Sequence, residues 1–459
     1  MKIKSIILAA GKGSRMRSDL PKVMHKIGGK SMLHHVIDTC KEAKSDDIVI
    51  VVGHHAEVVI ESVTDNNVSW VYQNDQLGTG HAVIQAIPNI DDNDVVLIAY
   101  GDVPLVRSET LKPLCECIGD YDYALLTTKL EKPTGYGRIV RDSSSGEIIE
   151  IVEEKDASDE IRKIDEVNTG IVAAKGKQLK RWLSMLTADN AQKEYYLTDC
   201  VAHAVSEGAA ITSVLCMDPV EIQGVNNRQQ QAELERGYQA RQAEGLMVAG
   251  ATLLDPQRVD VRGEVTVGKD VIIDINAVFI GNVHLSDGVS IEANCVIKNS
   301  SIGANTTIKP NSVIDDAEIG ALCDIGPFAR IRPDTVLKDS AKVGNFVEIK
   351  KSTVGEGSKV SHLSYIGDTE MGANVNIGAG TITCNYDGVN KFKTVIGDDA
   401  FVGSDSQLIA PVTIKAGATI GAGSTITQDT PEHTLTLSRS KQVSITGWKR
   451  PTKLTNKDS

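Results

Sequence analysis

The chain has 459 residues, and its 48 lysines and arginines against 61 aspartates and glutamates give a formal net charge of -13. This negative balance argues against a surface built to bind nucleic acid phosphates, and the length predicts two to four domains. The hydrophobic fraction is 41%, aromatic residues make up only 4%, and there are 40 glycines. An aliphatic core with many tight turns favours a repeat architecture.

The first residues of the chain and its cysteines indicate the cellular compartment in which we expect the protein. The opening MKIKSIILAAGKG has the charge and apolar run of a secretory signal, but the run stops at Lys12 without a cleavage pattern, so we interpret it as a buried strand. No stretch reaches the roughly 18 apolar residues of a membrane span. The eight cysteines contain no CxxC pair, and Cys115 and Cys117 are too isolated to form a zinc site. We expect a cytoplasmic protein with free thiols and no membrane partner.

Short aliphatic runs separated by helical spacing occur in the first half of the chain, at 3–9, 47–52, 69–73 and 95–100. This is the βαβ rhythm of a parallel sheet covered on both faces. We therefore predict an α/β domain with a Rossmann-like sheet over residues 1–227. Residues 228–250 are rich in Gln, Glu and Arg and lack proline, which predicts an exposed helical arm that links two domains.

A period of six residues runs through the second half, from Val265 to Ile426. Each hexad has an aliphatic residue, often followed by Gly, and then smaller or polar residues, as in VGKDVI, IGANTT, IGALCD, VGNFVE, VGEGSK, IGDDAF and IGAGST. Such hexads are typical of a parallel β-helix, in which each hexad forms one flat side and three form a coil. Residues 251–459 are predicted to form this β-helix and a C-terminal tail.

The hexad period lapses once, between Ile377 and Ile396. Polar residues replace the aliphatic anchors there, namely Asn385, Asp387, Asn390, Lys391 and Lys393. We predict a loop that leaves the wall of the β-helix. Insertions of this kind often carry the binding function of a repeat protein.

A glycine-containing loop follows the first predicted strand, in LAAGKGSRM at residues 8–16. Its backbone N–H groups can approach a phosphate, with Lys12, Arg15 and Lys22 adding positive charge. The third glycine of the dinucleotide fingerprint and the ending of a P-loop are both missing, and an ordinary strand-to-helix turn remains an alternative.

Asp102 follows the strand at 95–100 after a single glycine. Carboxylates at the carboxyl ends of parallel strands lie in the crevice where ligands bind, and an Asp there can hold Mg²⁺. Ordinary turn chemistry is the alternative. Together with the glycine loop, this residue predicts a nucleotide site.

Counting by sixes places two cations on one edge of the β-helix. Ile331, Leu337, Val343 and Ile349 are spaced six apart, so Arg332 and Lys350 follow anchors that lie one complete coil apart. Two stacked cations without an alternating carboxylate repel one another, so we expect an anion between them. Two solvated surface cations are the alternative.

The same register places His362 outside the packed interior. His362 stands second after Val360, and Ala379 stands second after Ile377 one coil later, so the imidazole should lie beside a small residue. A lone His is usually a surface residue. The segments SHLSY and CNYDGVNK nevertheless bring further polar side chains into the neighbourhood, namely Tyr365, Asn376, Asn385, Tyr386 and Lys391.

Two further small residues share that position in their hexads. Ser404 and Ala422 are each second after an anchor, and the anchors Val402 and Ile420 are one coil apart. Small side chains in an outward column make a shallow groove that fits a long, thin ligand such as the pantetheine arm of coenzyme A. Small residues are also common in β-helix walls.

Several motifs together resemble the sugar-nucleotide pyrophosphorylase family: LAAGKGSRM with Pro21-Lys22, QNDQLGTGHA at 73–82, YGDVPL, GYGRIV, VEEKDA, NTGI and EIQGVN. With the hexads, the whole chain is similar to the bacterial family of bifunctional N-acetylglucosamine-1-phosphate uridyltransferases/glucosamine-1-phosphate N-acetyltransferases. The resemblance implies a nucleotidyltransferase domain followed by a left-handed parallel β-helix of hexapeptide repeats, and a role in making UDP-N-acetylglucosamine for the cell wall. Two other interpretations are a single-activity nucleotidyltransferase with an oligomerising or regulatory β-helix, and a non-catalytic scaffold.

The resemblance implies roles for residues of the first domain. Arg15 and Lys22 bind phosphates, and Asp102 and Asn226 hold Mg²⁺. Gly137, Glu153 and Asn168 position the acetylated sugar. The remaining UTP and UDP-N-acetylglucosamine contacts are Leu8, Ala9, Ala10, Gly11, Gln73, Gly78, Thr79, Tyr100 and Gly101. The implied reaction is attack of a sugar-1-phosphate oxygen on the α-phosphorus of UTP, which depends on positioning and charge neutralisation.

The resemblance also implies roles in the second domain. His362 is the base that removes a proton from the 2-amino group of glucosamine-1-phosphate as that group attacks acetyl-CoA. The sugar phosphate is held by Arg332, Lys350, Tyr365, Asn376, Asn385, Tyr386 and Lys391. Acetyl-CoA is bound by Ala379, Asn385, Tyr386, Ser404, Ala422 and Arg439. The partners are glucosamine-1-phosphate, N-acetylglucosamine-1-phosphate, UTP, acetyl-CoA and two further copies of the chain in a homotrimer whose subunits share their acetyl sites.

Overall fold

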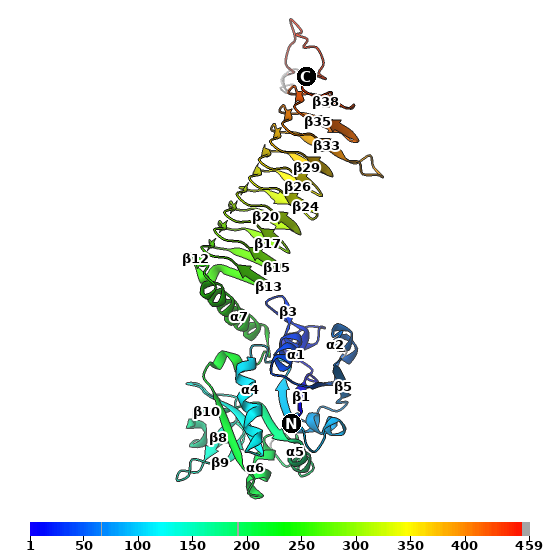
Figure 1. Cartoon of the computed structure of the whole chain (residues 1–459). Helices are drawn as coiled ribbons and strands as arrows, with labels where there is room; N and C mark the ends of the chain where they lie inside the picture. The colour runs from blue at the N-terminus through cyan, green and yellow to red at the C-terminus, as the bar shows by residue number, and fades with distance from the viewer. Residues whose placement is uncertain (66, 191, 452–459) are drawn as a thin grey trace, which may run out of the picture. The chain divides into compact units, whose positions relative to one another are not determined.

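The computed structural model describes residues 1–65, 67–190 and 192–451. Internal contacts divide the chain into two compact units, Met1–Gln242 and Ala243–Ser459. The first unit is an α/β domain, and the second is a stack of short parallel strands (Figure 1). Within the described ranges, no helix is both long and apolar enough to cross a membrane.

The central sheet of the first unit has the order β11-β7-β10-β6-β1-β4-β5, and β8 and β9 attach to it through β10. Strands β1, β4, β5 and β6 are parallel, as the aliphatic runs predicted. Strand β10 is antiparallel to β6 and β7, so the sheet is mixed. The chain reaches β10 through the β8–β9 hairpin instead of a crossover helix, and it therefore runs back in the opposite direction. The strands are β1 Ile3–Leu8, β4 Asp47–Val52, β5 Val68–Tyr72, β6 Val95–Tyr100, β7 Tyr123–Lys129, β8 Arg138–Arg141, β9 Ile148–Val152, β10 Glu166–Lys175 and β11 Ile211–Cys216.

Helices cover both faces of this sheet because its central strands are apolar on both sides. Residues Ile7 and Ile50 pack in a buried cluster with α1, α2 and α4, whereas Ile6 and Val49 pack in another with α3, α5 and α6. The carboxyl ends of β1 and β6 remain available for a ligand. The helices are α1 Met32–Glu42, α2 Ala56–Ser62, α3 Thr79–Gln85, α4 Ser108–Glu116, α5 Gly176–Leu183, α6 Asp199–Ser206 and α7 Arg228–Val248.

The long polar helix α7 is only partly exposed. Leu234 is 1% exposed and packs in a cluster of the first unit. Arg241 Nη1 donates to the carbonyl oxygen of Leu105 at 2.6 Å, and its Nη2 donates to Asp218 Oδ2 at 3.0 Å. Ala243 belongs to the core cluster of the second unit. These contacts fix about the first four turns of α7, up to Arg241, to the α/β domain.

The second unit is a parallel β-helix, and this confirms the predicted fold class. Three columns of strands form its three sides. One side contains β12 Thr252–Leu253, β14 Ile272–Ile273, β16 Ser290–Ile291, β19 Thr307–Ile308, β22 Asp324–Ile325, β25 Lys342–Asn345, β28 Lys359–His362, β31 Asn376–Ile377, β34 Phe401–Val402, β37 Thr419–Ile420 and β39 Leu435–Thr436. The second contains β17 Val296–Lys298, β20 Val313–Asp315, β23 Arg330–Ile331, β26 Glu348–Lys350, β29 Tyr365–Gly367, β32 Ile382–Cys384, β35 Gln407–Ile409 and β38 Thr425–Ile426. The third contains β18 Ser301–Ile302, β21 Ala317–Ile319, β24 Thr335–Leu337, β27 Thr353–Val354, β30 Thr369–Met371, β33 Thr394–Ile396 and β36 Val412–Ile414, and the longer strands β13 Val259–Val267 and β15 Ala277–Leu285 precede both columns.

The hexad anchors form the core of this unit. Ile308, Ile325, Val343 and Val360 pair in register on successive coils and are all at most 1% exposed. Between β32 and β33 the chain forms the predicted loop, in which Tyr386 and Lys391 pair in an isolated antiparallel bridge. The loop projects from the stack near β33 in Figure 1. The lapse in the hexad period therefore marks a real departure from the wall.

Candidate active sites

A cavity of about 330 Å³ lies at the carboxyl ends of β1 and β6. A Cβ atom built on Gly11 would meet no atom within 4 Å, so the backbone of the glycine loop faces open space. Most residues predicted to bind the nucleotide line this cavity. Its walls are Leu8, Ala9, Ala10, Gly11, Lys22, Val23, Gln73, Gln76, Gly78, Thr79, Ala82, Tyr100, Asp102 and Glu194.

One wall of this cavity is held in place by the side chain of Gln73, which is 4% exposed. Its Nε2 donates to the carbonyl oxygen of Gly78 at 3.1 Å and lies 3.1 Å from His81 Nδ1. Gly78 has φ of 109°, and a Cβ built there would lie 2.6 Å from the carbonyl oxygen of Tyr195. Glycine is therefore required at this position.

Two oxygen atoms from distant parts of the chain meet at the cationic edge of the cavity. The Lys22 ammonium contacts Asp102 Oδ2 and lies 3.4 Å from Asn226 Oδ1. Arg15 Nη2 donates to the same Asn226 oxygen at 3.0 Å. Asn226 reaches this place because the N–H of Val225 donates to the carbonyl oxygen of Asp102 at 3.0 Å. The structure therefore brings Arg15, Lys22, Asp102 and Asn226 together.

These oxygens fit a small, hard cation. A carboxylate and an amide oxygen are ligands that Mg²⁺ accepts, and a cationic ammonium already lies between them. No group of three or more His, Cys, Asp or Glu side chains that could hold a metal occurs in the described ranges. A metal at this edge would therefore take its other ligands from water and substrate phosphates.

A second cavity, of about 110 Å³, shares Thr79 and Tyr100 with the first. Glu153 and Asn168 line it, and the Asn168 N–H donates to the carbonyl oxygen of Gly137 at 2.8 Å. Thr198 Oγ1 donates to Glu153 Oε1 at 3.0 Å. Burial raises the pKa of Glu153, and Asp199 and Asp156 add to this effect. The three predicted sugar contacts thus lie together, next to the nucleotide cavity.

Some predicted residues lie beside the cavities, and some lining residues were not predicted. Gly101 lines neither cavity; its N–H donates to the carbonyl oxygen of Leu8 at 3.0 Å and so holds two loops together. Gln76 belongs to the QNDQLGTGHA motif on which the resemblance rests, so this motif could have indicated that Gln76 lines the cavity. Glu194 and Thr198 follow no strand end or glycine motif, and no sequence signal indicated them.

The β-helix register confirms that Arg332 and Lys350 are one coil apart, because Ile331 pairs with Ile349. The expectation that no carboxylate lies between such cations is wrong. Arg332 Nη1 donates to Glu348 Oε1 at 2.7 Å, and Lys350 Nζ lies 3.9 Å from Asp368 Oδ2. The prediction considered only the residues that follow each aliphatic anchor. Glu348 stands directly before its anchor, Ile349, and was therefore missed.

The loop after β32 adds a further cation to this edge. Asn385 Nδ2 donates to Asp368 Oδ2 at 2.5 Å, and the Phe392 N–H donates to the carbonyl oxygen of Asn385 at 2.9 Å. The loop thereby places Lys391 against Lys350, whose ammonium group lowers the pKa of Lys391. Two like charges that are close enough for one to lower the pKa of the other favour an anion beside them.

His362 lies at the end of β28, one corner before β29 and Tyr365. Its Nδ1 lies 2.9 Å from Oδ1 of Asn345, the residue paired with it on the preceding coil. Val360 pairs with Ile377 on the following coil, which places Ala379 next to His362 as predicted. Asn376 is on the same side but pairs with Lys359, and Tyr386 Oη donates to the carbonyl oxygen of Gly388 at 2.5 Å. Neither of these two described residues has a hydrogen bond to the imidazole.

The column of small residues continues from Ala379 along the same side. Val402 pairs with Ile377 and with Ile420, so Ser404 and Ala422 lie on the next two coils, as the spacing predicted. The side chain of Arg439 borders this column, since its Cδ lies 3.7 Å from a Cβ built on Gly423. The structure thus places four predicted acetyl-CoA contacts, Ala379, Ser404, Ala422 and Arg439, along one strip.

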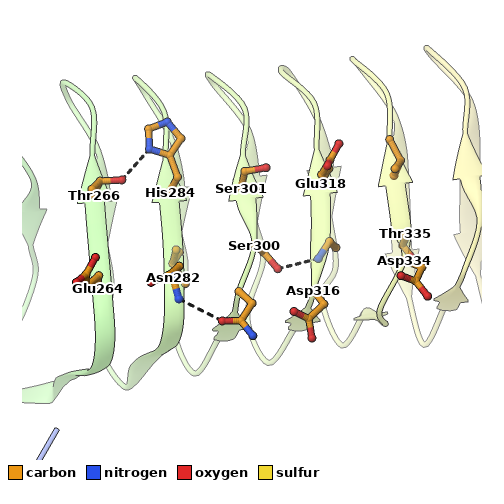
Figure 2. A pocket seen from close by; sticks show the side chains of 14 residues that line it. Glu264, Thr266, Asn282, His284, Ser300, Ser301, Asp316, Glu318, Asp334 and Thr335 are labelled. Carbon is orange, nitrogen blue, oxygen red and sulfur yellow. Dashed lines mark hydrogen bonds between the residues drawn. The ribbon is translucent and has the colours of Figure 1, made fainter. Parts of the chain in front are cut away.

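A groove of about 740 Å³ on the third side of the β-helix contains none of the predicted residues. Figure 2 shows its acidic and neutral side chains, among them Glu264, His284, Glu318 and Asp334. Among the residues that the structure describes, no lysine or arginine lines it. Because a phosphate needs cationic or N–H partners, this groove does not fit the phosphorylated substrates that the other sites suggest.

Comparison with known proteins places the chain in a family. Residues 5–167 match the MobA-like NTP transferase domain, residues 261–345 the GMPPB C-terminal domain, and residues 393–428 the bacterial transferase hexapeptide model with six repeats. The chain is 55% identical to a "Bifunctional protein GlmU" of Marinobacter nauticus over 98% of both chains. It is also 55% identical, over 98% of both chains, to the protein of the same name from Cupriavidus pinatubonensis. This chain therefore belongs to the bifunctional GlmU family, as the sequence motifs predicted.

Proposed function

We propose that the two units perform the two successive transfers that make UDP-N-acetylglucosamine. The β-helix moves an acetyl group from acetyl-CoA to glucosamine-1-phosphate, and the α/β domain then moves a uridylyl group from UTP to N-acetylglucosamine-1-phosphate. The chain is an enzyme with nucleotidyltransferase and acetyltransferase activities, as its family membership supports. The observation that carries the proposal is the presence of two separate sites, each with its own cationic cluster.

In the first transfer, His362 takes the proton. The amine nitrogen of the sugar forms a bond to the acetyl carbon, the carbon–sulfur bond breaks, and coenzyme A leaves as the thiolate. The proton lost from nitrogen moves to the imidazole, which can then pass it to the thiolate. Arg332, Lys350 and Lys391 hold the sugar phosphate, with Tyr365, Asn376, Asn385 and Tyr386 orienting the sugar. Ala379, Ser404, Ala422 and Arg439 hold acetyl-CoA.

In the second transfer, the α/β domain positions two anions against each other. The glycine loop and Gln73, Gly78 and Thr79 bind the nucleotide, while Gly137, Glu153 and Asn168 hold the acetylated sugar in the adjoining cavity. Arg15 and Lys22 neutralise charge on the phosphates. Asp102 and Asn226 hold the divalent metal of this domain, which we propose is Mg²⁺. When bound, Mg²⁺ neutralises the charge that develops on the phosphate oxygens.

The interpretation of a single activity with a merely structural β-helix is not favoured. A purely oligomerising wall has no use for a loop that brings Lys391 close enough to Lys350 to lower the pKa of Lys391. We propose further that the protein is a cytoplasmic homotrimer. Exposed apolar residues on one corner of the β-helix support association, since Phe346 is 57% and Leu363 is 62% exposed.

Two separate assays test the proposed activities. With glucosamine-1-phosphate and acetyl-CoA alone, the protein should release free coenzyme A thiol. With N-acetylglucosamine-1-phosphate, UTP and Mg²⁺, it should release pyrophosphate. Pyrophosphate release without any thiol release would support the single-activity interpretation instead.

Replacing Lys350 with Ala should weaken the binding of the phosphorylated sugar. The expected effect is a KM for glucosamine-1-phosphate raised by about tenfold or more, since a charged hydrogen bond of about 1.5–3 kcal/mol is lost. Free glucosamine has no phosphate, so kcat/KM with that substrate should change much less. Lys338→Ala, an exposed lysine elsewhere on the β-helix, is the matched control. Equal defects with both sugars would contradict the phosphate site.

Replacing Ala422 with Trp should block acetyl-CoA binding. The indole would fill the strip beside Ser404, whereas the buried anchor Ile420 stays untouched. Acetyl-CoA affinity measured by calorimetry should fall below detection, with uridylyl transfer unchanged. Ala304→Trp, at the same position of a hexad on the third side, should leave affinity intact. If Ala422→Trp binds acetyl-CoA as tightly as the unchanged protein, the groove lies elsewhere.

A further inference from the structure

The imidazole of His362 has one polar partner among the described residues. Its Nδ1 lies 2.9 Å from Asn345 Oδ1, and the two residues pair in register on neighbouring coils. Asn345 belongs to the hexad VGNFVE, but no role was predicted for it, and the two transfers described above do not use it. The ladder between β25 and β28 fixes both backbones, so the contact is built into the β-helix and does not depend on a mobile loop.

A neutral imidazole carries one proton, on Nδ1 or on Nε2, and only the other nitrogen can accept a proton from substrate. The amide oxygen of Asn345 can only accept a hydrogen bond. It therefore favours the tautomer with the proton on Nδ1 and leaves the Nε2 lone pair free. On the following coil the neighbour of His362 is Ala379, whose methyl group offers no competing hydrogen bond.

We infer that Asn345 is a positioning residue for acetyl transfer, holding His362 in the orientation and tautomer that present Nε2 to the sugar amine. This inference rests on the proposed role of His362 as the base. An amide differs from the carboxylate that orients the histidine in many catalytic triads. The Asn345 amide orients the ring without adding a negative charge. A carboxylate would stabilise the protonated imidazolium, and this form cannot act as a base.

Other charged groups near His362 do not take this role. None of them has a hydrogen bond to the imidazole in the described part of the chain. His362 lies on β28, the paired strands are β25 and β31, and β26, β29 and β32 follow the corner. The titratable side chains on these strands are Lys342, Lys359, Glu348, Lys350, Tyr365 and Cys384. Glu348 is engaged by Arg332, and Lys350 lies between Asp368 and Lys391.

Two substitutions in the full-length protein separate positioning from mere structure. Asn345→Ala removes the acceptor, and kcat for acetyl transfer should fall by about tenfold or more because the ring is no longer oriented. KM for both substrates should change little. Asn345→Asp restores an acceptor but adds a charge that favours the imidazolium. The acid limb of its pH profile, where activity falls as His362 gains a proton, should therefore move up by about one pH unit, with activity recovered above it.

Two controls separate the effect of Asn345 on His362 from a general charge effect and from misfolding. Asn311→Asp adds the same charge to the same edge two coils away and should leave the acid limb in place. Uridylyl transfer should be unchanged in every variant because its site lies in the other unit, and an unchanged thermal unfolding midpoint of the β-helix shows that the variant is folded. An unchanged kcat in Asn345→Ala would overturn the inference. So would an acid limb in Asn345→Asp that moves no further than in Asn311→Asp.

A spectroscopic measurement tests the inference without relying on activity. In the unchanged protein labelled with ¹⁵N-histidine, the His362 signals, assigned by their loss in His362→Gln, should show the proton on Nδ1 at neutral pH. A proton on Nε2 would contradict the inference. If instead His362→Gln retains full acetyl transfer while the Nδ1 proton is present, the proposed base is wrong and the orientation by Asn345 is still correct.

Discussion

His362→Ala should lower the turnover of acetyl transfer by roughly 10²–10⁴-fold, the usual contribution of a positioned proton acceptor. The side chain lies outside the core on β28, and its removal leaves the buried anchor Val360 and the ladder to β31 in place. Thermal stability and uridylyl transfer should therefore stay close to those of the unchanged protein. Thiol release measured at saturating glucosamine-1-phosphate and acetyl-CoA reports the effect.

The control for this substitution is His284→Ala. His284 is also an exposed histidine of the β-helix, but it lies in the acidic groove on the third side, where Thr266 is its partner at 2.8 Å. It should have no effect on either activity. A loss of less than about fivefold in His362→Ala, which is under about 1 kcal/mol of barrier, would make His362 an ordinary surface residue.

Asp102→Ala should abolish uridylyl transfer and leave acetyl transfer near normal. The substitution removes one of the two proposed metal ligands and leaves the Lys22 ammonium without its carboxylate partner. Pyrophosphate release should fall by several orders of magnitude, because charge neutralisation is a major part of phosphoryl-group catalysis. Calorimetric titration with Mg²⁺ in the presence of UTP should show weakened binding.

Asp120→Ala, at an exposed turn of the same domain, provides the control and should not affect either reaction. Asp102→Asn keeps the shape of the side chain and tests whether its charge is needed. Comparable loss of both activities in Asp102→Ala would contradict the assignment of separate sites.

The parts of the structure that were predictable are those with a fixed period. A coil of a β-helix is about three hexads long, so the positions of the aliphatic anchors placed Ser404 beside Ala422 and His362 beside Ala379. The strands β1, β4, β5 and β6 were equally predictable, since buried parallel strands read as continuous aliphatic runs.

Contacts between distant segments were not predictable from patterns. The meeting of Asn226 with Asp102 depends on a backbone hydrogen bond from Val225, and only the family resemblance indicated it. Glu348 faces Arg332 from a position before its anchor, which a count of the residues after each anchor overlooked. The antiparallel course of β10 follows from the hairpin before it, and aliphatic runs alone do not give strand direction.

The central claim is that one chain contains two independent transfer sites, and mixing two variants tests it most directly. Asp102→Ala and His362→Ala are purified separately, and each is supplied with glucosamine-1-phosphate, acetyl-CoA, UTP and Mg²⁺. Neither alone should form UDP-N-acetylglucosamine at more than a small fraction of the normal rate. The mixture should form it after a lag, because the acetylated sugar phosphate released by Asp102→Ala is used by His362→Ala. A mixture that forms no UDP-N-acetylglucosamine, although each variant retains its own half-reaction, would contradict the account, and so would a single variant that completes both steps at the normal rate.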